Sequence, residues 1–497
     1  MKNRQRFMLA FIILLSGVLR CLFLNSREIY YDDAFSVFLS NRSLAEIISG
    51  TAADTMPPLY YFLLHAWQKL GAAQLWQLRF LNVGLSVLVV LGVYLAVQKL
   101  ATEKAALWAA FFTAISPFQI YHAQEIRMYV ILELNLLGYF LSFLEFYQPG
   151  ETINKLPPKI GFVIFGALAM YSHNLAIFSI AAINIFLLIK KEWKQLFQVI
   201  SLQVFIGILA LPWLWFVPQQ VSKIQTAFWT PRPALVEVIQ ALVQSTASLP
   251  LSGLWMTAAV VLSIQVLVLT LLEAFRQGKN DYRIELLAVV AITPPLLMFL
   301  TSYFMRPIFV ARGFIFSILA FYMIIAIVLT KSNQKILMYL LGGAMITSAA
   351  ISLPQQFTFN GFPRSPYRQV TNYLAEQQNS LILHDNKLSF FPCHFYNQAL
   401  PQYFLPDEPG SHNDTYAVTS QQAMDIFPAR DLASITDGAA SIHFVVFERA
   451  IQEYQKAGRL NHPELETLEQ RYQIIGIKRF NDLLVYHFLL LDESLVE

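Results

Sequence analysis

The chain has 497 residues, of which 56% are hydrophobic, 14% aromatic and only 13% charged, and its formal net charge is +3. This composition excludes a soluble enzyme of the same length and indicates an integral membrane protein. The basic residues form no concentrated patch, so nucleic acid is not an expected partner. The only two cysteines, Cys21 and Cys393, are far apart, which argues against a disulfide framework or a cysteine metal site.

Eleven apolar windows follow one another along the first 353 residues, and we interpret each as a membrane-spanning helix. They lie near 7–24, 79–98, 104–117, 127–147, 158–172, 174–190, 196–217, 253–274, 284–304, 308–330 and 335–353. The first window has the basic flank of a signal peptide, but no small-residue cleavage site follows it. We therefore expect it to be retained as the first helix.

Basic residues are unevenly distributed among the loops when the N-terminus is placed in the cytoplasm. The loops on that side then contain Lys2, Arg4, Arg6, Lys99, Lys104, Lys155, Lys159, Lys190, Lys191, Lys194, Arg276, Lys279, Arg283, Lys331 and Lys335. The short loops on the other side contain few, as the positive-inside rule requires. We expect the loops at 25–78, 118–126 and 218–252, and everything after about residue 355, on the outer side.

The first outer loop combines acidic and aromatic residues. Asp32 and Asp33 follow two tyrosines, and Asp54 precedes the run Met56-Pro57-Pro58-Leu59-Tyr60-Tyr61. An apolar stripe over 34–49 predicts an amphipathic helix at the membrane interface. A second helix over 59–70 is expected to begin at the two prolines.

Adjacent carboxylates near a membrane surface are costly, because they repel each other and lose hydration. Sites that need a general base, a bound cation or both commonly tolerate this cost. The alternative is structural: aspartate is a good N-cap, and a helix beginning near Ala34 would use one. The spacing of Asp32 and Asp33 leaves both interpretations open.

Further ionisable residues lie at the outer ends of later windows. In the run from Ser116 to Tyr129, Arg127 offers a planar donor group for phosphate, and Glu125 could hold a metal or orient that arginine. A tyrosine belt with a structural Glu–Arg pair is the alternative. His173 falls between two spans, where a lone histidine is more often structural than a ligand. Arg312 lies in an apolar helix and needs an anionic partner, either a phosphate or a carboxylate such as Glu125.

The composition becomes more polar from about residue 355. A helix is predicted over 367–378, followed by strands over 380–384, 442–448 and 483–489. We divide the chain into a membrane domain, 1–354, and a soluble α/β domain, 355–497, on the outer side. The predicted fold class is thus a mostly α, polytopic helical bundle with a C-terminal α/β domain.

These motifs in this order resemble the membrane glycosyltransferases of the GT-C type, in particular glycosyltransferase family 39, with its bacterial relatives of protein O-mannosyltransferases and of aminoarabinose transferases. The likeness covers most of the first 350 residues. It rests on Tyr31-Asp32-Asp33, Pro57-Pro58-Leu59-Tyr60-Tyr61 with Trp67 and Gly71, Arg79, Gln124-Glu125-Ile126-Arg127-Met128-Tyr129, Tyr171-Ser172-His173, and Pro307 with Arg312. The chain has Asp33 where members usually have glutamate, Met56 where they often have histidine or lysine, and Gly313 where a tyrosine is expected.

The resemblance implies an inverting glycosyltransferase in the bacterial inner membrane. Its donor would be a polyprenyl-phosphate monosaccharide, and its acceptor a hydroxyl of an envelope glycolipid, polysaccharide or protein. Asp32 would be the base, with Asp33 as a catalytic helper. The residues expected to bind the donor phosphate or substrate are Arg127, Glu125, Tyr129, Arg312, His173, Tyr60 and Tyr61. Asp33 and Glu125 are candidates for holding a divalent cation, although the resemblance does not fix a metal requirement.

Two other functions fit part of the sequence. A polytopic transporter would also combine many spans with intramembrane charge, but matching halves with broken helices are not evident. A polysaccharide polymerase or ligase would place its key groups in a long late outer loop, and 218–252 offers only Lys223, Arg232 and Glu237. The residues therefore favour transfer over both.

Overall fold

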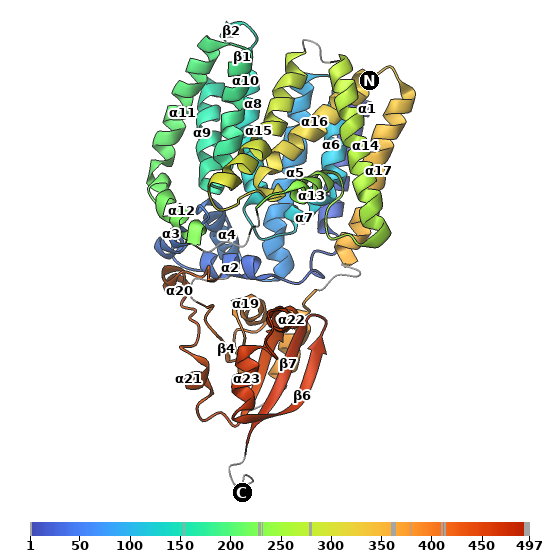
Figure 1. Cartoon of the computed structure of the whole chain (residues 1–497). Coiled ribbons are helices and arrows are strands. Elements are labelled where there is room, and N and C mark those ends of the chain that lie inside the picture. Colours follow the sequence, from blue (N-terminus) through green and yellow to red (C-terminus); the bar gives the residue numbers. More distant parts are fainter. Residues whose placement is uncertain are drawn as a thin grey trace.

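A computed structural model describes residues 2–152, 155–226, 230, 232–277, 281–358, 364–377, 379–408, 411 and 414–491. A helical bundle forms one end of the molecule and a smaller α/β domain the other (Figure 1). The long helices of the bundle are α1 (Lys2–Cys21), α5 (Leu75–Leu100), α6 (Glu103–Ile115), α8 (Tyr129–Phe146), α9 (Leu156–Ser172), α10 (Ala176–Ile189), α11 (Trp193–Leu214), α14 (Gly253–Gln277), α15 (Tyr282–Phe304), α16 (Ile315–Lys331) and α17 (Lys335–Thr358). Each predicted window coincides largely with one of these helices.

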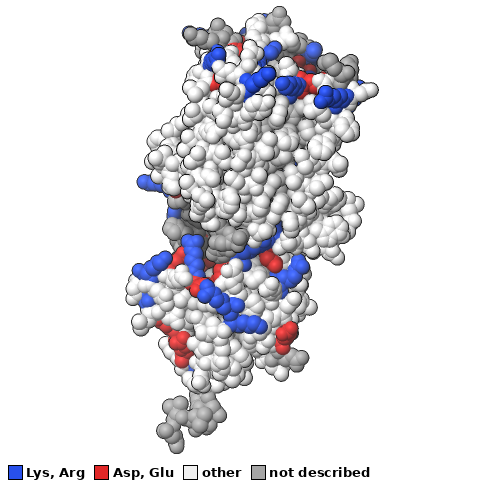
Figure 2. Space-filling model, turned by 90° about the vertical axis from the view of Figure 1, so that its right-hand side faces the viewer, with Lys and Arg blue, Asp and Glu red and all other residues white. Residues whose placement is uncertain are grey.

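Seven helical segments in the described part of the chain are long and apolar enough to cross a membrane, and the chain is an integral membrane protein. They are α5, α8, α11, α14, α15, α17 and the stretch Ala311–Lys331, which joins the short helix η1 (Ala311–Phe314) to α16. The helices α6, α9 and α10 are shorter, and α1 is not among the seven either, so eleven crossings remain a prediction. On the face that Figure 2 shows, a largely uncharged belt crosses the bundle, with charged residues above and below it.

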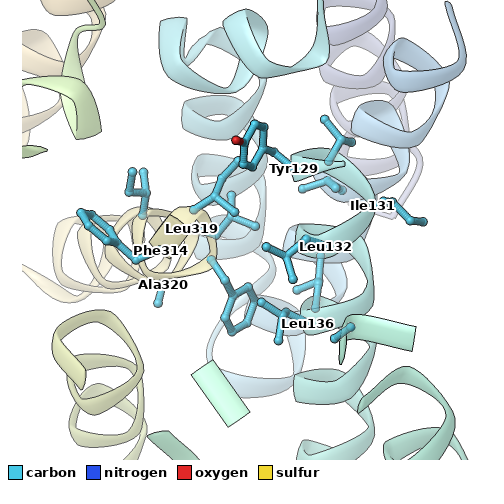
Figure 3. Packing of buried hydrophobic residues seen from close by; sticks show 14 of the residues in the cluster. Tyr129, Ile131, Leu132, Leu136, Phe314, Leu319 and Ala320 are labelled. Carbon is cyan, nitrogen blue, oxygen red and sulfur yellow. The ribbon is translucent and has the colours of Figure 1, made fainter. Parts of the chain in front are cut away.

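The helix α16 forms the centre of the bundle. In its apolar window 89% of the residues are buried, against 28% in α11 and α14, which therefore present apolar side chains outward. Leu132 and Leu136 of α8 pack close to Phe314, Leu319 and Ala320 of η1 and α16 (Figure 3). Helices that are apolar on all sides suit a bundle whose rim faces lipid.

Short helices cover the end of the bundle that faces the soluble domain. They are α2 (Tyr31–Ser40), α3 (Leu44–Ala53), α4 (Leu59–Lys69), α7 (Pro117–Ala123), α12 (Val217–Thr226) and α13 (Leu235–Thr246). The N-terminus of the chain and the hairpin of β1 (Tyr147–Gln148) and β2 (Glu151–Thr152) lie at the opposite end (Figure 1). The side of the membrane that each end faces remains a prediction.

In the first loop, the structure differs from one prediction and from one of the two interpretations left open for the aspartates. A single helix over 34–49 does not form, because Ser43 starts α3 with a capping box: its hydroxyl accepts from the Glu46 amide, and the Glu46 carboxylate accepts from the Ser43 amide. Neither aspartate is the N-cap of a helix near Ala34, because α2 begins at Tyr31 and holds both in its first turn. The predicted helix over 59–70 is confirmed as α4, whose N-cap is Pro58.

The soluble domain is built on a five-stranded sheet with the order β4–β3–β5–β7–β6. The strands are β3 (Leu381–His384), β4 (Gln402–Phe404), β5 (Ser441–Phe447), β6 (Tyr472–Phe480) and β7 (Leu483–Leu490); the helices are α18 (Tyr367–Ala375), α19 (Lys387–Tyr396), α20 (Val418–Met424), α21 (Leu432–Thr436), α22 (Glu448–Lys456) and α23 (Pro463–Glu469). The strands β4, β3 and β5 are parallel, whereas β5, β7 and β6 are antiparallel. The three predicted strands are confirmed as β3, β5 and β7. The very short β4 and the exposed edge strand β6 were missed.

Aromatic contacts join the soluble domain to α2. The ring of Phe391 on α19 lies 5.1 Å from Tyr31, 6.4 Å from Phe35 and 5.8 Å from Phe38, measured between centroids. Phe391 belongs to the same buried cluster as the bundle core. Pairs of this kind add about 0.5–1.5 kcal/mol each beyond area burial, so the helix that carries Asp32 and Asp33 is held from both sides.

Candidate active site

A cavity of about 560 Å³ lies where the bundle meets the soluble domain, within the usual size range of ligand sites. The bundle end of the chain lines most of it, with Tyr30, Tyr31, Asp32, Asp33, Phe35, Asp54, Thr55, Met56, Tyr121, Glu125, Arg127, Tyr129, Lys223 and Arg312. The soluble domain adds Tyr367, Lys387, Leu388, Thr415 and Phe447. The structure thus brings together six of the predicted site residues: Asp32, Asp33, Glu125, Arg127, Tyr129 and Arg312.

The two adjacent aspartates have different surroundings. Asp33 is 3% exposed, and its Oδ1 accepts a hydrogen bond of 3.1 Å from the Ile126 amide. Asp32 is only partly buried, and its carboxylate makes no hydrogen bond or ion pair with any residue that the structure describes. One carboxylate is therefore committed to the fold, and the other is available to a ligand in the cavity.

Arg79 forms an ion pair with Asp33. This fully buried arginine lies 3.9 Å from Asp33 Oδ2 and donates to the carbonyls of Leu24, Arg27 and Glu28. Burial raises the pKa of Asp33 to about 6, and the Glu125 carboxylate adds to the rise, while Arg79 opposes it. The carboxyl group is thus close to its ionisation point under mildly acidic conditions.

Glu125 lies between two basic partners. Its carboxylate is 2.7 Å from His122 Nδ1 and 3.5 Å from Arg27 Nη2, and Arg27 also stacks on the Tyr121 ring at 4.0 Å. Burial disfavours its charge, but His122 and Arg27 outweigh that effect and lower the pKa of Glu125 to about 2. Glu125 is therefore a stable anion that orients its neighbours.

Arg127 lines the cavity beside Asp32. Its Nη1 donates to the Asp32 carbonyl at 3.2 Å and to Ser36 Oγ at 3.1 Å. Its Nε is buried and has no hydrogen-bond partner among the described residues, which is costly unless a ligand supplies an acceptor. Arg312 lies 5.5 Å from the centre of the Tyr129 ring on the same wall. The two guanidinium groups suit an oxyanion such as phosphate.

Two lysines complete the cavity, Lys223 from the bundle end and Lys387 from the soluble domain. Lys223 of α12 is 3.8 Å from Asp54 and donates to the Ala53 carbonyl. Lys387 is only 2% exposed, forms an ion pair with Asp407 and lies 5.8 Å from the Tyr31 ring centre. The sequence analysis did not single out Lys387 as a site residue. No local pattern could indicate it, because it reaches the cavity only through docking of α19 on α2.

Three predicted site residues lie behind the cavity wall. Tyr60 and Tyr61 are fully buried, and neither hydroxyl has a hydrogen-bond partner in the described part of the chain. The ring of His173 is 5.9 Å from Tyr129, and its Nδ1 accepts from the Leu175 amide. Burial and the charges of Arg127 and Arg312 lower the pKa of His173 to about 3. The histidine is therefore neutral and supports Tyr129 from behind.

The suggested cation site at Asp33 and Glu125 fits poorly. Asp33 is held by the Ile126 amide and Arg79, and Glu125 by His122 and Arg27. Guanidinium groups beside both carboxylates already balance their charge and would repel a cation. These two carboxylates therefore do not suit a divalent cation.

A second cavity of about 400 Å³ adjoins the first and shares Tyr121, Glu125 and Arg312 with it. Its other wall includes Glu237, Gln240 and Gln244 of α13. Residues of α13 thus line an approach to Arg312.

The family model for dolichyl-phosphate-mannose-protein mannosyltransferase matches residues 55–217. The match includes Glu125, Arg127 and His173 but begins after Asp32 and ends before Arg312. No curated protein sequence matches the chain.

Solved structures of two other proteins share the architecture. ArnT from Cupriavidus metallidurans bound to undecaprenyl phosphate has a TM-score of 0.62 at 10% identity, over 96% of this chain and 97% of that one. The archaeal oligosaccharyltransferase AglB from Archaeoglobus fulgidus, in complex with an inhibitory peptide and a dolichol-phosphate, has a TM-score of 0.52 at 12% identity, over 100% and 75%. The chain is therefore similar to both in architecture, although identities this low show only the fold.

Proposed function

We infer that the chain is a membrane glycosyltransferase, because its fold is of the GT-C type. We propose that it transfers a monosaccharide from a polyprenyl-phosphate donor to a hydroxyl group of an envelope acceptor, a glycolipid, polysaccharide or protein, with inversion at the anomeric carbon. One observation carries the proposal: a single cavity, where the bundle meets the soluble domain, holds the uncommitted Asp32 carboxylate and the guanidinium wall of Arg127 and Arg312.

In the proposed reaction, the Asp32 carboxylate removes the proton from the acceptor hydroxyl as its oxygen attacks the anomeric carbon. The bond between that carbon and the phosphate oxygen breaks, so the bonding electrons leave with the polyprenyl phosphate. Arg127 and Arg312 stabilise the negative charge that develops on this leaving group. The proton ends on Asp32, and the glycosidic bond to the acceptor is complete.

Asp33 and Asn82 position Asp32 and Arg127. Asp33 joins α2 to the loop before α8 through the Ile126 amide, which sets Asp32 against Arg127. Asn82 donates to the carbonyls of Glu125 and Arg127 and holds the same loop from the bundle side. The second cavity, beside the exposed apolar residues Leu235 and Val236, provides the approach for the lipid-linked phosphate.

The orientation in the membrane follows from this chemistry. The bacterial inner membrane supplies polyprenyl-phosphate sugars, and the acceptor is an envelope component. We place the cavity and the soluble domain on the outer side and the N-terminus in the cytoplasm. The positive-inside distribution of lysine and arginine supports this orientation.

The test uses the purified full-length chain in proteoliposomes with radiolabelled undecaprenyl-phosphate monosaccharides and envelope membranes from cells that lack the protein. We expect label to move into an acceptor, and Asp32→Asn to reduce the rate about 10²–10⁴-fold. Asp437→Asn makes the same change at an exposed position and should retain the wild-type rate. Wild-type turnover by Asp32→Asn would disprove the assigned base. Release of labelled sugar across the bilayer without transfer would favour a transporter.

A further inference from the structure

A buried histidine lies between two carboxylates in the soluble domain, away from the residues of the cavity. His462, which precedes α23, is 3% exposed. Its Nε2 is 3.4 Å from Asp385 Oδ1, and its Nδ1 is 2.8 Å from Glu464 Oε2. One donor atom from each of the three side chains lies within 4.8 Å of the others. In the described residues, this is the only group of three or more possible ligands at such spacing.

The hydrogen bonding of the group is incomplete. Neither His462 Nδ1 nor Glu464 Oε2 meets the geometry of a hydrogen bond with any described residue, although the two atoms approach closely. Asp385 Oδ2 accepts from the Asn386 amide group, which leaves Oδ1 facing the histidine. Buried polar atoms without partners are rare and costly, so a missing ligand is the simplest explanation.

We propose that Asp385, His462 and Glu464 bind one divalent cation of the first transition series, with zinc as the best match. One imidazole nitrogen with carboxylate oxygens is a common donor set for such ions, and water completes the coordination.

The position of the site suggests what the cation does. Asp385 directly follows β3, and its amide donates to the Val445 carbonyl of β5. Two residues later, Lys387 enters the cavity and pairs with Asp407. A cation bound here would tie the start of α23 to the connection between β3 and α19, which carries Lys387. The site does not depend on the proposed transferase activity, but its occupancy would hold one wall of the cavity.

The test measures metal binding by the full-length chain in detergent after treatment with EDTA and dialysis. Titration with Zn²⁺, and separately with Mn²⁺ and Ca²⁺, should give one tight equivalent of Zn²⁺ and weaker binding of the other two. Zn²⁺ should raise the Tm and protect backbone amides of residues 381–396 from hydrogen exchange. His462→Gln should remove the tight equivalent, and Glu464→Gln should weaken it about 10–100-fold.

Glu469→Gln is the matched control, because it makes the same change on the exposed face of α23 and should bind Zn²⁺ like the wild type. Folded wild-type protein that binds no Zn²⁺, or undiminished binding by His462→Gln, would overturn the proposal. If His462→Gln does not fold, zinc K-edge absorption of the wild type decides instead. Imidazole and oxygen ligands support the site, and a sulfur ligand or no imidazole refutes it.

Discussion

The two walls of the cavity hold their charges in different ways. On the bundle side, Asp33 and Glu125 each have at least one protein partner within 3.5 Å, and buried arginines that also bind backbone carbonyls support them. On the side of the soluble domain, Lys387 pairs with Asp407 of the same domain and lies beside the Tyr31 ring. We call the bundle side the rigid wall and propose that it faces the reacting phosphate. The side of the soluble domain is the second wall, and we propose that it faces the acceptor.

The largest expected effect concerns the rigid wall. Arg127→Ala removes the guanidinium with the unsatisfied Nε and should lower kcat/KM for the polyprenyl-phosphate donor about 100-fold, as losses of one oxyanion donor do. Initial rates over a range of donor concentrations at fixed acceptor measure it. The kcat/KM of Arg127→Lys should lie between those of the wild type and Arg127→Ala, because lysine keeps the charge but lacks the planar fork of donors.

A control separates charge from scaffolding. Arg127 also bridges the Asp32 carbonyl and Ser36 Oγ, so its loss could act through the shape of α2. Ser36→Ala removes part of this bridge and leaves the guanidinium in place. An equal fall of kcat/KM for the donor in Ser36→Ala, or an unchanged kcat/KM in Arg127→Ala, would contradict the phosphate role.

Sequence alone located the rigid wall because its residues lie in local runs. Asp32 with Asp33 and Glu125 with Arg127 are neighbours in sequence, and both pairs lie next to apolar windows whose length fixes where a helix ends. The wrong prediction of one helix over 34–49 could have been avoided from sequence alone, because Ser43 and Glu46 have the spacing of a capping box, which marks the start of a new helix.

The second wall could not be predicted in this way. Lys387 and Leu388 come more than 350 residues after Tyr31, and only the packing of Phe391 against α2 brings them to the cavity. The partners of Asp33 have the same origin, because Arg79 and the Ile126 amide lie on other segments. The residue types indicate the chemistry of the site. The tertiary contacts were needed to show that Asp33, and not Asp32, has protein partners for its carboxylate.

The pH dependence of stability tests whether Asp33 is as tightly enclosed as its contacts indicate. Its pKa is raised from 3.8 to about 6, so the folded state binds its proton more tightly than the unfolded state. The resulting stability is fully present below about pH 4 and is lost as the pH rises through 6, by up to about 3 kcal/mol over the whole interval. The opposite contribution of Glu125, whose pKa is lowered to about 2, is constant above about pH 4.5.

We therefore expect the Tm of the wild type, relative to Asp33→Asn, to rise as the pH falls from 7 to 4.5. Asparagine can still accept from the Ile126 amide, so the comparison isolates the charge. Scanning Asp437→Asn in parallel controls for the exposed carboxylates. A wild type that loses stability relative to Asp33→Asn on acidification would show that Arg79 dominates the pKa instead of burial.

The smallest expected effect concerns Lys387, on the second wall of the cavity. Lys387→Gln should lower the rate with envelope acceptor about fivefold, equivalent to about 1 kcal/mol for one contact. It should also lower the Tm, because it leaves the partly buried Asp407 without its partner. The double variant Lys387→Gln with Asp407→Asn removes the unpaired charge and should regain the Tm. If Lys387 touches the substrate, the double variant keeps the fivefold loss of rate. If Lys387 serves only the fold, the rate returns with the Tm, and the soluble domain then acts as a support for α2.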